Sequence, residues 1–350
     1  MTIHFARWAV ARRPALVGLA FPTALVGGFA VVRAAQNVWA VDAHRNLAAA
    51  VALQHGAFGS DPDYLYSPLA AALTVPAVAL PTDVAVVAWL ALKIALLVVG
   101  TAIATRELGR IDRLLLGVAV VAFLPILYDL ELGNVTVLIA AAIATVAWIP
   151  DRASAGIPLG IILATAPKPQ LIPVLIWMAL FRRRALAGAL GAAGVGTLAG
   201  FVVVGPGPYE AWIAALRAPP DLTRGNLSLS GMPTLVAIPA ALAVVAGTIL
   251  ALRRGPAPGL VAALACGLLV SPYTILYGAG VLLVATPCLA RAAPRGTLAL
   301  ALLAPVGLVV AFPLWVASVG LLAFAVPSEP WPGGAPLGVS VAPPPARVAS

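Results

Sequence analysis

The sequence predicts an all-α integral membrane protein, built as a polytopic helical bundle of about 11–12 spans with external juxtamembrane helices. Composition is the first observation: the 350 residues are 62% apolar and only 9% charged, with a mean hydropathy of +1.04. The second is that the apolar residues form long runs separated by short polar stretches. Apolar surface on this scale requires lipid as the solvent, which excludes a soluble globular protein.

The apolar runs follow one another along most of the chain. In order, they cover about residues 14–32, 83–105, 114–129, 134–149, 156–167, 170–181, 186–204, 233–252, 258–270, 274–290 and 297–316. The first run follows a basic start and is longer than the core of a usual signal peptide, so we interpret it as an uncleaved span. Whether residues 313–326 form a twelfth span is left open.

Two external segments are expected to form helices without crossing the membrane. Residues 66–81 make an apolar stretch that is short for a span, and Pro76 and Pro81 interrupt it. We interpret this stretch as a juxtamembrane or re-entrant piece. An interfacial helix is expected near Tyr209–Leu216, within the loop 205–232.

The distribution of charge predicts which side of the membrane each loop occupies, because short loops rich in Lys and Arg stay in the cytoplasm. With the N-terminus inside, fourteen basic residues fall in inside loops and five in outside loops. Arg182-Arg183-Arg184 is interpreted as one of these topology signals. We expect a multi-pass protein of a bacterial plasma membrane, with a cytoplasmic N-terminus and long external loops at 33–82 and 205–232.

The chain is expected to form one transmembrane domain over residues 1–326, followed by a tail rich in Pro and Gly over residues 327–350. Cys266 and Cys288 both fall inside apolar runs, so no disulfide framework is indicated. The three histidines are too dispersed for a metal site, and no metal or other cofactor is predicted. The net charge of +9 comes from scattered basic residues, which argues against a nucleic-acid partner.

Two lysines lie where a positive charge is costly. Lys168 stands between Pro167 and Pro169, where two short apolar segments meet, and such polar breaks hold charge near buried ligands in membrane proteins. The alternative is a lysine that snorkels at a helix end. Lys93 lies in the middle of an apolar run, where a charge costs about 2.5–3.5 kcal/mol on insertion scales. We expect Lys93 to pair with an acid such as Asp129, or else to act in a site.

Several short segments together resemble the motifs of a known protein family, both in their order along the chain and in the side of the membrane that they are predicted to occupy. They are Asp42 with the helix after it and Gly56, Tyr64–Leu69, Glu131–Asn134, Pro167–Pro169 ahead of Arg182–Arg184, Gly225–Gly231 and Leu269–Pro272. With these segments the chain resembles glycosyltransferase family 87, the polyprenol-phosphate-mannose-dependent mannosyltransferases of the GT-C superfamily. One segment departs from that pattern: after Ser271-Pro272 the family often carries Trp and His, whereas this chain continues Tyr273-Thr274-Ile275-Leu276-Tyr277. Any role of that histidine in contacting acceptor or phosphate is therefore lost or reassigned.

The resemblance implies that Asp42 is the general base of an inverting sugar transfer. Lys168 is expected to hold the phosphate of the lipid donor, because a cation near hydrocarbon is costly and tends to have a function. From the residues alone, Asp42 also suits a cap of a helix over residues 43–54, or a partner for Arg45. The other residues that we expect to contact substrate are His44, Arg45, Asp63, Tyr64, Tyr66, Asn134 and Asn226.

Position in the sequence gives a reason for several of these contacts, and for some of them an alternative. His44 and Arg45 are on the predicted external side, where they are available to the acceptor or the phosphate. A carboxylate beside Tyr64 and Tyr66 suits a sugar-binding rim, but tyrosines of a membrane-interface belt are the alternative. Asn134 is placed to hydrogen-bond sugar hydroxyls, or else it only borders the end of a helix.

The expected partners are a polyprenyl-phosphate sugar, mannose by the resemblance, a glycolipid or envelope glycan as acceptor, and membrane lipids. Two other functions remain open at this point. A lipid or glycan transporter, such as a flippase, would use similar broken helices, but it should show repeat symmetry, which the sequence does not reveal. A non-catalytic relative would keep the fold without the activity.

Overall fold

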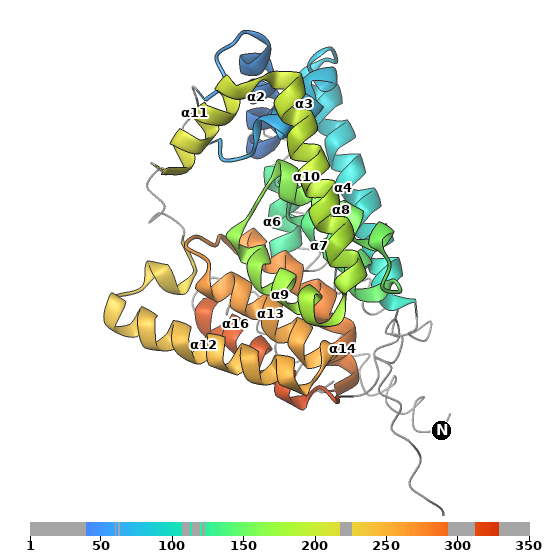
Figure 1. Cartoon of the computed structure of the whole chain (residues 1–350), viewed down its shortest axis with the longest axis vertical. Helices are drawn as coiled ribbons and strands as arrows, with labels where there is room; N and C mark the ends of the chain where they lie inside the picture. The colour runs from blue at the N-terminus through green and yellow to red at the C-terminus, as the bar shows by residue number, and fades with distance from the viewer. Residues whose placement is uncertain are drawn as a thin grey trace, which may run out of the picture.

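The computed structural model describes residues 40–59, 61, 64–106, 113, 120, 123–217, 226–292 and 312–328 (Figure 1). These residues form helices joined by turns, and no strand occurs among them, which confirms the predicted all-α class. The first apolar run, half of the run 114–129, most of the run 297–316, Asp63 and the tail from residue 329 lie outside the described residues. The number of spans therefore stays a prediction.

The helices follow the apolar pattern of the sequence closely. In chain order, they are α2 (Val41–Gln54), α3 (Pro68–Val78), α4 (Thr82–Thr105), α6 (Leu124–Leu132), α7 (Thr136–Trp148), α8 (Ala153–Thr165), η1 (Pro169–Leu171), α9 (Ile172–Phe181), α10 (Arg183–Val204), α11 (Pro206–Arg217), η2 (Leu229–Gly231), α12 (Thr234–Arg254), α13 (Pro256–Val270), η3 (Leu276–Ala285), α14 (Thr286–Ala292), α16 (Phe312–Leu321) and η4 (Leu322–Ala325), where η marks a 3-10 helix.

Among the described helices, α4, α10 and α12 are long and apolar enough to cross a membrane. They contain 24, 22 and 21 residues, so each is more than about 30 Å long, which matches the hydrocarbon core of a bilayer. Large apolar side chains on their outer faces are exposed, including Val98 at 62%, Leu198 at 66% and Leu235 at 92%. Figure 1 shows α4 and α10 running along the molecule, while α12 runs across it.

The shorter apolar helices form the interior. In α13 the residues from Ala257 to Leu269 are all buried, and α9, α12 and α16 pack around it. A helix that is apolar around its whole circumference is stable when other helices surround it. The apolar run predicted at 258–270 thus forms the central helix of the C-terminal half.

Two predictions about short segments are confirmed. The stretch 66–81 forms α3, which has only 11 residues, contains Pro76 and is about 16 Å long, so it is as short as the sequence predicts. Its place beside the membrane stays a prediction. The break at Pro167–Pro169 separates α8 from η1 and α9, as the two prolines predict.

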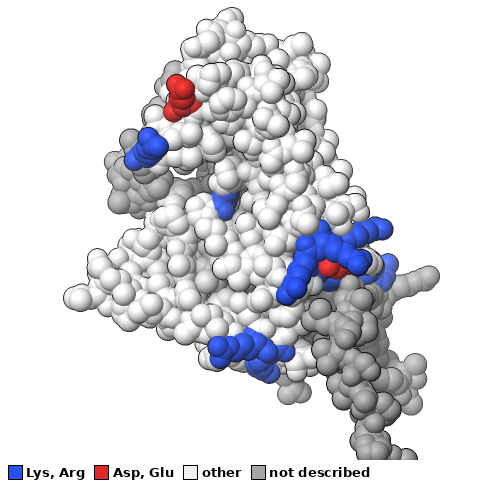
Figure 2. All heavy atoms as spheres, viewed as in Figure 1, with Lys and Arg blue, Asp and Glu red and all other residues white. Residues whose placement is uncertain are grey.

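Basic side chains gather at one end of the molecule. Figure 2 shows most of the Lys and Arg on this face at the end opposite α2, α3 and α11. Arg182 at this end does more than mark topology, because it is only 1% exposed and its Nη2 donates to the carbonyl of Ala147 at 2.8 Å. Asp151 accepts the backbone N–H of Ala185 at 2.9 Å, which satisfies the start of α10.

Candidate active site

The first turn of α2 holds Asp42. The helix begins at Val41 after Ala40, which adopts a left-handed conformation with φ 60°, and no side chain caps it. The N–H of Ala40 donates instead to the carbonyl of Glu131 at 2.6 Å. The alternative of Asp42 as a helix cap is therefore wrong, and its half-buried carboxylate is free to make a longer-range contact.

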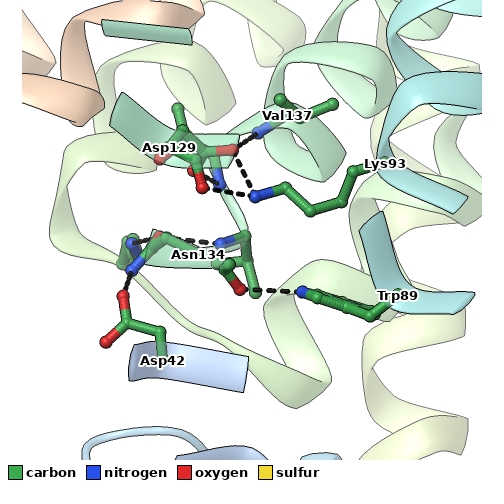
Figure 3. A network of polar contacts seen from close by, with 10 residues as sticks. Asp42, Trp89, Lys93, Asp129, Asn134 and Val137 are labelled. Atoms are coloured by element: carbon green, nitrogen blue, oxygen red, sulfur yellow. Dashed lines mark hydrogen bonds and ion pairs between the residues drawn. The ribbon is translucent and has the colours of Figure 1, made fainter. Parts of the chain in front are cut away.

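That contact is with Asn134, in the turn between α6 and α7 (Figure 3). The Nδ2 atom of Asn134 donates to Oδ2 of Asp42 at 2.6 Å. The Oδ1 atom of Asn134 accepts from Nζ of Lys168 at 3.3 Å and from the N–H of Val135 at 2.7 Å. Three predicted site residues from distant parts of the sequence thus form one hydrogen-bonded chain.

Helix α4 supports the turn that carries Asn134. Lys93 forms an ion pair with Asp129, with 2.8 Å between Nζ and Oδ2, and both side chains are 0% exposed. This confirms the predicted pairing of the two residues. Asp129 also accepts the N–H of Thr136 at 2.9 Å, and Trp89, one turn before Lys93, donates from Nε1 to the carbonyl of Gly133 at 2.8 Å.

Gly133 lets α2 pack directly on this turn. Its φ is +71°, a conformation that favours glycine, and it ends α6. A Cβ atom at Gly133 would lie 2.8 Å from Cβ of Ala43, next to Asp42 in the chain. The short distance between Asp42 and Asn134 therefore depends on the missing side chain at Gly133.

Lys168 faces the same region from the break between α8 and η1. Its Nζ lies 5.4 Å from the centre of the Tyr277 ring and 6.0 Å from that of Tyr66, within the range of cation–π attraction. Lys168 is half-buried, and no carboxylate of the described residues lies within ion-pair distance of it. Figure 2 shows a hollow on this face between the parts that carry α11 and α12. Lys168 therefore offers a positive charge to a bound anion.

Tyr64 and Tyr66 pack edge to face, with ring centres 5.6 Å apart. Tyr64 is 7% exposed, and its hydroxyl has no hydrogen-bond partner among the described residues. Burial raises the pKa of the Tyr64 phenol. Burial also raises the pKa of Tyr66, and the charge of Asp42 adds to the effect. Both phenols therefore stay neutral and remain donors at physiological pH.

The other described residues that were predicted to contact substrate are exposed or interact with other groups of the protein. His44 is exposed, and Arg45 forms an ion pair with Asp61, with 3.9 Å between Nε and Oδ2. Asn226 donates to the carbonyl of Pro272 at 3.1 Å, and its Oδ1 accepts the N–H of Thr274 at 3.1 Å. The segment of Asn226 is therefore joined to the segment that follows Ser271-Pro272.

Sequence reasoning missed Trp89, Gln170 and Tyr277. Trp89 could have been found from its spacing, because residues four apart share one helix face and Lys93 is charged. Gln170 donates from Nε2 to the carbonyl of Tyr273 at 3.0 Å, which links the Lys168 break to the segment of Tyr277. No local signal indicates that bond, since 103 residues separate its partners.

A groove of ≈670 Å³ lies between α2, α3, α10 and α11. Its lining is mainly apolar and includes Leu53, Phe58, Val75 and Val203, with Gln54 among the polar groups. No cluster of three or more His, Cys, Asp or Glu suited to a metal ion occurs in the part of the chain that the structure describes.

Comparison with known proteins identifies the family. A family model, glycosyltransferase family 87, matches residues 64–318, which is well over half of the chain. The match contains Tyr64, Tyr66, Asn134 and Lys168, whereas Asp42 precedes it. A search of curated proteins found no match, and a search of solved structures found none. The chain therefore belongs to glycosyltransferase family 87 and is a glycosyltransferase built on membrane helices.

Proposed function

We propose that this protein transfers a hexose, mannose, from a polyprenyl-phosphate donor to a glycolipid or glycan acceptor on the outer face of the membrane. The hydrogen-bonded chain Asp42–Asn134–Lys168 carries the proposal. It joins a carboxylate and an ammonium group through a single amide side chain. Group transfer from a sugar phosphate requires one group of each kind, a base for the acceptor and a cation for the leaving phosphate.

The proposed reaction is one displacement at the anomeric carbon. The hydroxyl oxygen of the acceptor forms the new bond to this carbon, and Asp42 takes the hydroxyl proton. The bond between the anomeric carbon and the phosphate oxygen breaks, and its electron pair leaves with polyprenyl phosphate. Lys168 stabilises the charge that develops on this phosphate. Attack opposite to the leaving group inverts the anomeric centre.

The expected contributions of these two residues are large. A placed general base contributes about 10²–10⁴ in rate. A preorganised group that stabilises developing charge contributes about 10²–10³. Oδ1 of Asp42 has no hydrogen-bond partner among the described residues, so it is free to accept the proton of the acceptor. No metal is needed for a lipid monophosphate donor.

The apolar groove supports a substrate that carries a lipid chain. Gln54 in the groove lies twelve residues after Asp42 in α2, which corresponds to about 18 Å along the helix axis. A polyprenyl chain is long enough to cover this distance while its sugar lies at Asp42. Val202 and Val203 at the end of α10 are 78% and 75% exposed, so the apolar surface continues from the groove towards lipid.

The distribution of arginines supports an external site. The arginine-bearing ends of α4, α10 and α12 lie opposite α2, α3 and α11. Under the positive-inside rule, the basic end faces the cytoplasm. The α2 end then faces outward in the plasma membrane, where a glycan or glycolipid acceptor is available.

The decisive experiment is Asp42→Asn, assayed in membranes supplied with radiolabelled polyprenyl-phosphate mannose. Loss of the base is expected to lower sugar transfer by at least about 10²-fold, because asparagine keeps the shape but accepts no proton. The matched control is Asp83→Asn, since Asp83 occupies the second position of α4 as Asp42 does of α2. The control should transfer sugar at the wild-type rate.

Three results would contradict parts of the proposal. Full turnover by Asp42→Asn removes Asp42 as the base. Transfer from polyprenyl-phosphate glucose but not from the mannose donor corrects the sugar. Absence of turnover by the wild-type protein with every lipid donor favours a flippase or a non-catalytic relative.

A further inference from the structure

We propose that Asn134 is a positioning residue, which orients Asp42 and sets its separation from Lys168, and that it does not bind the sugar. This inference rests on the proposed function, because it assigns the role of Asn134 within that transfer. It replaces the substrate contact that the sequence predicts for Asn134.

The hydrogen bonds determine which way the amide of Asn134 points. Its Oδ1 faces two donors, Nζ of Lys168 at 3.3 Å and the N–H of Val135 at 2.7 Å. Its Nδ2 faces an acceptor, Oδ2 of Asp42 at 2.6 Å. A flipped amide would place NH₂ against two donors and oxygen against a carboxylate, which removes all three bonds. Only one orientation of Asn134 is therefore compatible with its neighbours.

Burial leaves Asn134 little access to a substrate. Asn134 is 3% exposed, so a sugar has almost no access to its amide. A carbonyl oxygen has two lone pairs, and Oδ1 already uses both for Lys168 and Val135. The hydrogen bonds of Asn134 thus join protein groups to one another rather than to a ligand.

Rigid helices hold Asn134 in place. Lys93 and Trp89 lie one turn apart on α4. Lys93 forms the ion pair with Asp129, and Trp89 donates to the carbonyl of Gly133, the residue before Asn134. Asp129 also accepts the backbone N–H groups of Thr136 and Val137, at 2.9 and 3.4 Å, and so fixes the start of α7. Figure 3 shows these bonds surrounding the turn from which Asn134 reaches Asp42.

This arrangement has a consequence for the proposed displacement. The bond to Oδ2 holds the carboxylate of Asp42, and Oδ1, which no described residue bonds, can take the acceptor proton. The bond from Lys168 holds the cation at the opposite end of the same amide. Asn134 therefore sets the distance between base and cation, and an error of about 1 Å in such a distance costs about 10²-fold in rate.

The test separates positioning from binding by steady-state kinetics with polyprenyl-phosphate mannose. Asn134→Ala should lower kcat by about 10²-fold and leave the KM of donor and acceptor unchanged. Asn134→Asp keeps the shape of the side chain but replaces the NH₂ donor that faces Asp42 with a carboxylate oxygen, which cannot donate. It should therefore lower kcat as Asn134→Ala does. Asn134→Gln keeps the amide and should recover part of kcat. The control is Asn46→Ala, a half-buried asparagine one turn after Asp42, which should keep the wild-type kcat.

A second measurement does not depend on activity. Thermal unfolding of Asp42→Ala, Asn134→Ala and the double variant in detergent forms a double-mutant cycle. The two shifts in Tm should be non-additive, because each single substitution already removes the same hydrogen bond.

The outcomes distinguish this inference from the proposed function. A raised acceptor KM with normal kcat in Asn134→Ala overturns the positioning role and restores sugar binding. If Asn134→Ala keeps the wild-type kcat, or if the Tm shifts are additive, the positioning role is overturned. The proposed function is unaffected by either result. A non-additive cycle would still show that Asp42 and Asn134 interact. If the wild-type protein transfers no sugar, however, the proposed function is overturned, and with it the role of Asn134 in catalysis.

Discussion

Lys93 and Asp129 are fully buried charges, and the energetics of burial explain why they occur together. An ion that leaves water for a protein interior loses several kcal/mol of solvation, which a partner and further hydrogen bonds must offset. Asp129 has such bonds from Lys93, Thr136 and Val137. Breaking the pair would leave one buried charge without its partner, so the pair fixes the geometry of the turn at Asn134 more than it adds net stability.

Tyr64 gives a prediction at the same scale. Its buried hydroxyl has no partner among the described residues, and such a group costs about 1–3 kcal/mol. Tyr64→Phe keeps the ring contacts with Phe58 and Tyr66, so it should raise the free energy of unfolding by about 1 kcal/mol. Thermal unfolding in detergent measures the change. The control is Tyr209→Phe, which loses the 3.4 Å bond to the carbonyl of Thr197 and should not stabilise the protein.

The same variant should change the response to alkaline pH. Burial raises the pKa of Tyr64 in the folded state, whereas an unfolded tyrosine loses its proton near pH 10. Above about pH 10 the unfolded state therefore binds fewer protons than the folded state, and stability falls as pH rises. Tyr64→Phe should fall less steeply over this range. A folded Tyr64→Phe that transfers no sugar would show instead that the hydroxyl binds substrate, as the sequence predicts.

At the scale of helices, glycines decide how closely α8 and α10 pack. Cβ atoms at Gly156 and Gly188 would collide with the backbone of Ala185 and Ala153 on the facing helix. Small residues let helices in membranes approach until their backbones are in contact. This contact positions Lys168, because α8 ends just before it.

Gly188→Ala and Gly191→Ala make a matched pair within α10. A Cβ at Gly188 would lie within 3 Å of the Ala153 backbone, whereas no atom of the described residues lies within 4 Å of one at Gly191. Gly188→Ala should lower the free energy of unfolding by about 1–3 kcal/mol through overpacking. Gly191→Ala should raise it by about 0.5–1 kcal/mol, because alanine restricts the unfolded chain. Equal Tm values for the two variants would contradict the close contact of α8 and α10.

The sequence predicts where helices begin and end better than it predicts where they lie in the folded protein. Pro167 and Pro169 mark the break at Lys168 because proline ends helices, and Pro76 helps to mark α3 as short. The central place of α13 could not be predicted, because a helix that is apolar on all sides fits lipid and protein interior equally well. The role of Asn134 could not be predicted either, since its bond to Asp42 spans 92 residues.

For the whole molecule, charge is the strongest indication of orientation. Each arginine at a helix end is a weak signal alone, since it adds only a small bias to insertion. The arginine-bearing ends of α4, α10 and α12 all lie in the half of the molecule opposite α2, α3 and α11, so these biases act in one direction. The arrangement places the chain Asp42–Asn134–Lys168 away from the arginine-rich end, which agrees with the external site proposed above.

Orientation can be tested with two introduced cysteines in intact cells. Gln54 is exposed at the end of α2, and Arg253 is exposed in the last turn of α12. A membrane-impermeant maleimide should label Gln54→Cys in intact cells and Arg253→Cys only after permeabilisation, if the arginine-rich end faces the cytoplasm as proposed. The native Cys266 and Cys288 are buried, so the wild-type protein should give little background. Labelling in the reverse pattern would put Asp42 on the cytoplasmic side, where the acceptor would have to be a cytoplasmic glycolipid.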